Sequence, residues 1–452
     1  MRVHRLLVVW VLAGVPARAA ALGLDECLAL ARQHAPSLQA AAADVTRAEQ
    51  AILAARAALR PTLNFAASFT QVNEAPKAVF DTPGLPALQA RPVIKLGSAS
   101  ALNVKTELGY TLYSGGRDRA LVRAAQADAR VEDRGREEAD ADLVLRVSQA
   151  YFREVSAGHL QSAAAEALAA ARSHLNVAQA RVQAGVVPKL DALRAEENAS
   201  QREIALVRAR EARRMARVAL ETAIGTELPP AEALDEPASP SPIAPDSSAA
   251  LAAALAARPE IAALQRQVEA KDERIAAERA KRLPRIGLSG AAAYVAPNKV
   301  EDYANFTDPG LKTYLFTARV GMTMPLLDGG EISAHEGELR AERAGLEARR
   351  HDLELGVRHE VAQALSDLRV AVAVWDANES RITSASEALR LASASYKEGT
   401  ATGTDVRDAE TALADARAEQ AESLRDYWFA RVELDRATAA SLTGKEDPGK
   451  EN

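Results

Sequence analysis

Two stretches of the chain, LNVKTELGYTLYSGG (Leu102–Gly116) and FTARVGMTMPLLDGG (Phe316–Gly330), share one pattern. In each, apolar and polar side chains alternate before a Gly-Gly pair, and the two pairs lie 214 positions apart. Alternation with a period of two predicts a β-strand with one apolar and one polar face. Strands of about ten residues with these faces are typical of a barrel wall between lipid and water. A half-buried hairpin of a soluble protein shows the same alternation, so the pattern alone leaves both structures open.

The match between these stretches belongs to a duplication of the chain. Before the strands, the prolines at 36 and 61 recur 223 positions later, at 259 and 284. After the Gly-Gly pairs the offset stays at 214, and the following residues match: Val147 with Val361, Gly185 with Gly399, Asp191 with Asp405, and Leu220 with Leu434. The chain therefore contains one structural unit used twice, at 22–225 and 249–444, with a longer loop in the first repeat.

Each repeat is predicted to hold a strand pair followed by a long helix. The strand pairs cover about 62–113 and 285–327, and proline-free stretches then run from Gly116 to about Ala184 and from Gly330 to about Glu398. At 1.5 Å per residue, each of these helices would be about 100 Å long. Apolar residues at spacings of three and four form a stripe typical of a helix in the second repeat: Leu353, Val357, Val361, Leu365, Leu368, Val372 and Trp375.

A glycine ends each long helix, and a shorter helix is predicted to run back beside it. Gly185 and Gly399 stand where helix C-terminal glycines are expected, and the returning helices reach about Ile224 and Leu442. Each repeat thus contains a helical hairpin with its tip near residue 185 or 399. The predicted fold class is mainly α with membrane β, a duplicated unit of one long helical hairpin and two strands.

Three segments lie outside the repeats. Residues 1–21 have the basic start, short apolar run and small-residue end of a secretory signal peptide. Their apolar run of about ten residues is too short to cross a bilayer as a helix. Residues 226–248 are rich in proline, which excludes a regular helix or central strand there. This segment is predicted to be a linker along the outside of the helices, and residues 445–452 a polar tail.

Composition argues against several functions. The formal net charge of −6 becomes −9 once the three arginines of 1–21 are removed, so a nucleic-acid partner is not expected. The single cysteine, Cys27, excludes an intramolecular disulfide. Asp25 and Glu26 before it do not fit a lipid-anchor signal, so Cys27 is expected to be a small apolar residue of a short helix.

The sequence contains no recognisable catalytic or cofactor motif. The seven histidines show no metal-ligand spacing and are expected to be solvated helix residues. Phosphate-binding glycine loops, nucleophile elbows and HExxH motifs are missing from the sequence. We therefore expect no metal, no cofactor and no enzymatic activity.

Strands that enter lipid must pair all their backbone groups, which requires a closed barrel. Four strands cannot close, because about eight are the smallest practical number. The barrel must therefore be shared between chains. Two chains would give a narrow barrel filled by its own side chains, and three would give twelve strands with room for a pore. The strand count requires an oligomer and leaves its size open.

The chain resembles the TolC family of outer-membrane efflux proteins over essentially its whole mature length. The resemblance rests on LDECLALA (Leu24–Ala31), on the duplicated prolines and Gly-Gly pairs, and on ASYKEG (Ala394–Gly399) continuing through DVRDA (Asp405–Ala409). It implies a homotrimer in which a 12-strand β-barrel in the cell outer membrane continues as a 12-helix α-barrel through the periplasm. The linker would belong to a belt around that α-barrel.

The same resemblance implies a function and partners. Such chains form the passive exit duct of a tripartite efflux or secretion system. A periplasmic adaptor protein docks at the helical tips, and an inner-membrane pump supplies the energy. The adaptor-docking tips correspond here to Gly185, Val186 and Val187 in the first hairpin and to Gly399 and Thr400 in the second. The exported substrate does not follow from the resemblance.

Two sets of side chains near the tips match functional positions of the family. Asp405 and Asp408 match the acidic residues that ring the narrow periplasmic entrance. Asp191 and Tyr396 match an aspartate and a tyrosine that latch the two hairpins together by a hydrogen bond. The family pattern has an arginine where this chain has Ala401. A helix N-terminus also favours aspartates through its macrodipole, which is the alternative explanation of the acidic pair.

The main alternative function is that of a soluble periplasmic coiled-coil adaptor or scaffold protein. Adaptors place one helical hairpin between β-rich domains. The duplicated hairpin and the two strand pairs of this chain argue against that architecture.

Overall fold

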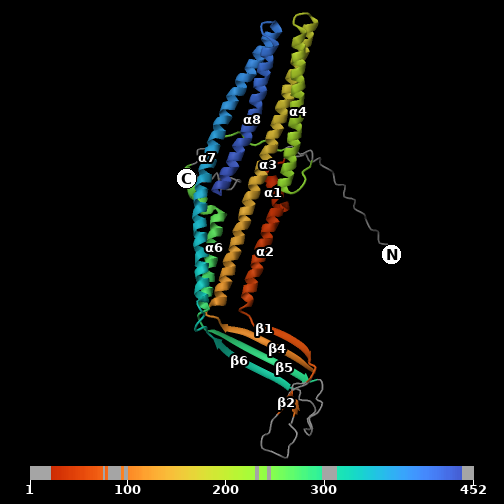
Figure 1. Cartoon of the computed structure of the whole chain (residues 1–452). Coiled ribbons are helices and arrows are strands. Elements are labelled where there is room, and N and C mark those ends of the chain that lie inside the picture. Colours follow the sequence, from red (N-terminus) through yellow and green to blue (C-terminus); the bar gives the residue numbers. More distant parts are fainter. Residues whose placement is uncertain are drawn as a thin grey trace, which may run out of the picture. The chain divides into compact units, whose positions relative to one another are not determined.

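The computed structural model describes residues 22–74, 77–79, 93–95, 100–229, 234–241, 246–297 and 313–439 (Figure 1). The predicted signal peptide and polar tail lie outside these residues. The described chain divides into two compact units. The first unit contains the described residues within 22–43, 134–262 and 351–439, and the second contains those within 44–133 and 263–350. Each unit takes segments from both sequence repeats.

The two long helices are confirmed. Helix α3 spans Arg117–Gln183, and α7 spans Glu331–Glu398. Their partners α4 (Lys189–Ile224) and α8 (Gly403–Thr438) follow after short turns. Gly185 and Gly399 lie in these turns with φ of +71° and +84°, a left-handed conformation that glycine adopts without a steric penalty. The two glycines therefore end the long helices as the sequence predicts.

The first unit has apolar cores between its helices. In one core, α1 (Leu24–His34) packs with α3, α4 and α8, and the buried side chains are Cys27, Leu28, Leu143, Val147, Phe152, Leu220, Ile224 and Val432. In a second core, α5 (Ser247–Ala257) and α8 cover the predicted stripe of α7 around Val357, Val361 and Leu365. Cys27 is fully buried, as expected for a packing residue.

Residues 234–241 of the proline-rich linker are held against the helices of the first unit. The Tyr151 hydroxyl donates a hydrogen bond to the Asp235 carbonyl over 2.9 Å. Leu22 and Leu234 form a parallel bridge, and the Ser241 amide donates to the Tyr427 hydroxyl over 3.4 Å. Burial raises the pKa of Tyr151, so its hydroxyl keeps its proton as a donor. Tyrosines on α3 and α8 thus fix the linker along the helices.

The second unit contains a four-stranded antiparallel sheet in the order β1-β4-β5-β6. Its strands are β1 (Thr62–Gln71), β4 (Ser100–Tyr113), β5 (Arg285–Pro297) and β6 (Thr313–Thr323). A separate short pair consists of β2 (Lys77–Val79) and β3 (Val93–Lys95). Within the described chain β1 pairs only with β4, and β6 pairs only with β5. The sheet is therefore open along both β1 and β6.

The strand register aligns the predicted apolar residues on one face. Leu63 lies opposite Leu108, Leu108 opposite Gly290, and Gly290 opposite Ala318. Large apolar side chains of this face are exposed on all but β5 in the single chain: Leu63, Phe65, Phe69, Leu102, Leu108, Tyr110, Tyr314, Phe316, Val320 and Met322. Asn64, Lys105, Glu107 and Arg319 lie on the other face. The predicted alternation of apolar and polar faces is confirmed.

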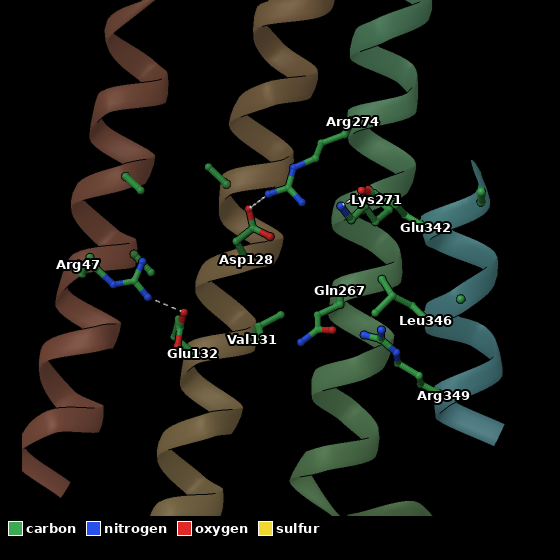
Figure 2. A pocket seen from close by; sticks show the side chains of 15 residues that line it. Arg47, Asp128, Val131, Glu132, Gln267, Lys271, Arg274, Glu342, Leu346 and Arg349 are labelled. Carbon is green, nitrogen blue, oxygen red and sulfur yellow. Dashed lines mark hydrogen bonds and ion pairs between the residues drawn. The ribbon is translucent and has the colours of Figure 1, made fainter. Parts of the chain in front are cut away.

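The helices of the second unit are joined by ion pairs. These helices are α2 (Pro36–Ala57), α6 (Pro259–Ala280) and the first parts of α3 and α7. Ion pairs join each helix to the next, and Figure 2 shows these residues: Arg47–Glu132 at 2.8 Å between α2 and α3, Arg274–Asp128 at 2.5 Å between α6 and α3, and Lys271–Glu342 at 2.5 Å between α6 and α7. The three hydrophobic clusters of the described chain all lie in the first unit. Buried apolar residues of this unit, such as Ala127, Ala270 and Ile275, are mostly small, and the ion pairs add charged contacts between the helices.

Glu336 is the most heavily paired carboxylate of this unit. It is buried, with 5% of its surface exposed, and it accepts from Arg279 of α6. Arg282 lies 3.1 Å away and Arg340, one turn further along α7, 2.7 Å away. These guanidinium groups, with the hydrogen bond from Arg279 first, hold the pKa of Glu336 below its ordinary value. The ionised carboxylate is therefore the form that ties α6 to α7.

We predict that Glu336→Gln lowers the thermal unfolding midpoint at pH 7, because three guanidinium groups lose their shared anion. Since the pKa of Glu336 is lowered on folding, its contribution is present above the ordinary glutamate pKa of about 4.5 and is lost as the pH falls through the depressed value. The difference in unfolding midpoint between the parent protein and Glu336→Gln should therefore shrink in acid. Thermal unfolding in detergent, followed by the helical circular dichroism signal, measures both midpoints.

The matched control is Glu347→Gln, one turn beyond Arg343 on α7. Its side chain is 44% exposed, and its partner Arg343 also binds Asp272, so little change is expected. Equal unfolding midpoints of Glu336→Gln and the parent protein at pH 7 would refute the conclusion that ion pairs stabilise this unit.

Candidate functional site

The two hairpin tips lie together in the first unit, at the ends of α3, α4, α7 and α8 (Figure 1). At the first tip, the Val186 amide donates to the Arg181 carbonyl over 3.0 Å, and at the second the Thr400 amide donates to the Ser395 carbonyl over 2.9 Å. These bonds close each helix over its left-handed glycine. The Val186 side chain is 62% exposed, so the first tip presents an apolar group to solvent.

Asp405 belongs to the start of α8. Its carboxylate accepts from the Thr402 amide and hydroxyl, each over 2.8 Å, while the Thr402 hydroxyl accepts from the Asp405 amide over 3.3 Å. This reciprocal pair is a capping box, which satisfies amides that the helix leaves free. The hydrogen bonds from Thr402 hold the pKa of Asp405 below its ordinary value. The helix-terminus explanation therefore accounts for Asp405 within the single chain.

Asp408 lies three residues further along α8, and its situation differs. Its side chain is 68% exposed, and its neighbour Arg407 lies 3.3 Å away. An exposed pair of this kind contributes little to stability. Asp408 is therefore the member of the predicted gate pair that local structure does not explain.

Tyr396 lies buried at the end of α7, with 3% of its surface exposed. The Arg181 guanidinium carbon lies 4.6 Å from the centroid of the Tyr396 ring, and this guanidinium also donates a hydrogen bond to the Tyr396 carbonyl. The His174 ring is nearly perpendicular to the Tyr396 ring, with the two centroids 5.3 Å apart. Burial first, and then the negative charge of Asp191, raise the pKa of Tyr396. Its hydroxyl has no hydrogen-bond partner among the described residues. The predicted bond between Tyr396 and Asp191 is thus not formed in this structure, and the latch stays a prediction.

A buried polar cluster that we did not predict joins the two hairpins beside Tyr396. Glu410 of α8 accepts a hydrogen bond from the Asn198 side chain of α4 over 3.0 Å. The other oxygen of Glu410 lies 3.6 Å from Nδ1 of His174 on α3, and both side chains are 7% exposed. Removing one side chain of such a pair leaves the other buried without its partner, which destabilises the folded protein. The cluster therefore ties α3 and α4 of the first hairpin to α8 of the second.

The expectation that the histidines are solvated is wrong for His174. A signal was present in the sequence, because His174 continues the buried stripe of Ala171 and Ala178 at spacings of three and four. Its partner Glu410 could not be inferred, since the two residues are far apart in the chain and no pattern links them.

Over the residues that the structure describes, no group of three or more His, Cys, Asp or Glu side chains is placed to hold a metal ion. None of the helices in this part of the chain is long and apolar enough to span a membrane.

Comparison with known proteins gives one family. The family model of the outer membrane efflux protein matches residues 27–226 and 250–440. The outer membrane efflux protein BepC of Brucella suis is 27% identical over 317 residues, which are 69% of this chain and 66% of that protein. The match thus spans slightly less than two thirds of that relative's length.

Solved structures show the same fold. A membrane protein from Pseudomonas aeruginosa superposes with a TM-score of 0.72 at 24% identity, over 92% of this chain and 93% of that one. The CmeC outer membrane channel of Campylobacter jejuni superposes with a TM-score of 0.75 at 17% identity, over 92% and 85%. This agreement confirms the predicted fold class, a mostly helical chain with a sheet that stays open in the single subunit. The chain belongs to the outer membrane efflux protein family, and its location is the outer membrane.

Proposed function

We propose that three copies of this chain form an outer-membrane channel that serves as the passive exit duct of an efflux or secretion system. The observation that carries the proposal is the open sheet with its exposed apolar face. Phe316, Phe65 and Met322 are 79%, 71% and 68% exposed in the single chain. Soluble monomers rarely expose a contiguous apolar surface of that kind. Lipid would cover this face, and the polar face with Lys105, Glu107 and Arg319 would line water.

The two open edges support an oligomer. In lipid, the unpaired backbone groups of β1 and β6 each need a partner strand, and a neighbouring copy offers the complementary edge. Repeating the four-stranded sheet three times gives twelve strands, enough for a barrel with a pore. A soluble adaptor or scaffold would leave both the edges and the apolar face exposed to water.

The helical tips suit an adaptor. Val186 at the first tip is followed on α4 by Leu190 and Leu193, which are 52% and 50% exposed. An apolar row at helical spacing is a surface that a partner helix can cover. We infer that a periplasmic adaptor docks at these residues, at Gly185 and Val187, and at Gly399 and Thr400 of the second tip. The inner-membrane pump behind that adaptor would supply the energy.

The first prediction from the proposed function concerns the channel itself. Purified protein should behave as a detergent-soluble trimer and should form conducting pores in planar lipid bilayers, because twelve strands enclose water. Light scattering with detergent correction measures the mass, and single-channel recording measures the conductance. A water-soluble monomer without pore activity would rule out the proposed function.

The second prediction separates the two aspartates of the proposed gate. Asp408→Asn should weaken the block by hexamminecobalt(III), a trivalent cation, because carboxylates at a constriction attract cations. Helix α8 should keep its first turn, since Asp408 has no part in the capping box. Asp405→Asn should weaken the block and also speed hydrogen exchange of residues 402–408. If both variants and the double variant keep the parent's block and cation selectivity, these aspartates are not the gate.

The third prediction concerns the latch. Tyr396→Phe combined with Asp191→Ala should raise the conductance of the closed channel, because a lost hydrogen bond between hairpins removes about 1 kcal/mol from the closed state. Tyr427→Phe is the matched control, since its hydroxyl contacts the linker at Ser241 instead. Unchanged conductance in the double variant would show that the Tyr396 hydroxyl forms no latch in the assembled channel either.

A further inference from the structure

A hollow of about 880 Å³ lies in the second unit, lined by residues of α2, α3, α6 and α7 (Figure 2). Ion pairs join α2 to α3, α3 to α6 and α6 to α7, so the four helices stand side by side in that order. One hollow can touch all four helices of such a row only on its concave side. If the row is part of a barrel wall, that side faces the interior. We call this hollow the trough.

The acidic side chains of the trough are all paired. Each is held by a basic side chain that also lines it: Glu132 by Arg47, Asp128 by Arg274, and Glu342 by Lys271. A cation that enters the trough therefore meets no carboxylate without a partner.

Arg349 of α7 is the fourth basic residue of the trough, and it is exposed. It makes no ion pair or hydrogen bond within the described part of the chain, and Figure 2 shows its side chain extending from α7 toward Gln267 of α6. The Gln267 carboxamide likewise has no partner among the residues that the structure describes. Leu346 and Val131, with small alanines of α2 and α3, add an apolar lining. The trough thus offers a free guanidinium, a free amide and apolar contact.

We propose that the trough binds organic anions, with Arg349 as the residue that holds the anionic group. A guanidinium presents two parallel N–H donors that fit a carboxylate or sulfonate, and Gln267 can donate a further hydrogen bond. The small apolar residues leave room for a flat hydrocarbon part. This inference rests on the proposed channel and names its cargo class. In a trimer, three Arg349 side chains face the duct at one level and raise the local concentration of anions.

Benzenesulfonate is the probe, and benzenesulfonamide is its neutral counterpart of nearly the same shape. Calorimetric titration of the detergent-solubilised oligomer at low ionic strength should show binding of the anion and little binding of the sulfonamide. Arg349→Gln should weaken the affinity for benzenesulfonate about tenfold, because a charged hydrogen-bonded contact is lost. Arg349→Lys should retain part of the affinity that Arg349→Gln loses, since lysine carries the positive charge but lacks the two parallel N–H donors of the guanidinium.

Arg343→Gln is the matched control. It removes the same charge from the same helix, but Arg343 is paired with Asp272 at 2.7 Å and Glu347 at 3.0 Å and does not line the trough. The affinity of the Arg343→Gln variant for benzenesulfonate should equal that of the parent protein. Equal loss in both variants, equal binding of the sulfonamide, or unchanged binding in Arg349→Gln would each overturn the site.

Conductance of the same preparation separates the two proposals. Pores that conduct, together with an Arg349→Gln affinity equal to the parent's, would leave the channel intact and refute the anion site. Anion binding that depends on Arg349 in a preparation without pore activity would support the site and refute the channel on which its role in export depends.

Discussion

Two rows of backbone N–H and C=O groups, along the outer edges of β1 and β6, have no partner strand within the described residues. In a bilayer such groups cannot turn to water, and each unpaired one costs several kcal/mol. The apolar face of the same sheet prevents the opposite solution, which is to leave the edges in water. In the channel that we propose, another copy of the chain therefore supplies the missing strands.

The two units solve the packing of long helices in different ways. In the first, the linker and short helices α1 and α5 cover the hairpins, so Leu143, Leu220 and Leu368 can be buried completely. In the second, ion pairs join the four neighbouring helices, and buried alanines allow these helices to approach closely. Of the four basic side chains that line the trough, Arg349 is the one that makes no ion pair within the described residues.

Much of the fold followed from local patterns. The alternation in Leu102–Leu112 and Phe316–Met324 gave strands on the correct faces, and Gly185 and Gly399 marked the helix ends, because each pattern reflects the backbone of its own segment. Contacts between distant segments could not be predicted in this way. The pairing of His174 with Glu410 joins residues on different hairpins, and nothing near Tyr396 in the sequence indicates that its hydroxyl is left without a partner.

The most direct test of the account is a disulfide between β1 and β6. Cys27 is the only native cysteine and is fully buried, so it should not react. Ala66→Cys on β1 would be combined in turn with cysteine at four positions of the same polar face of β6: Leu315, Thr317, Arg319 and Gly321. Within one chain these strands lie three spacings apart, about 14 Å, too far for a disulfide. Oxidation should give a reducible covalent trimer for at least one pair, whereas monomers for all four would contradict the shared barrel.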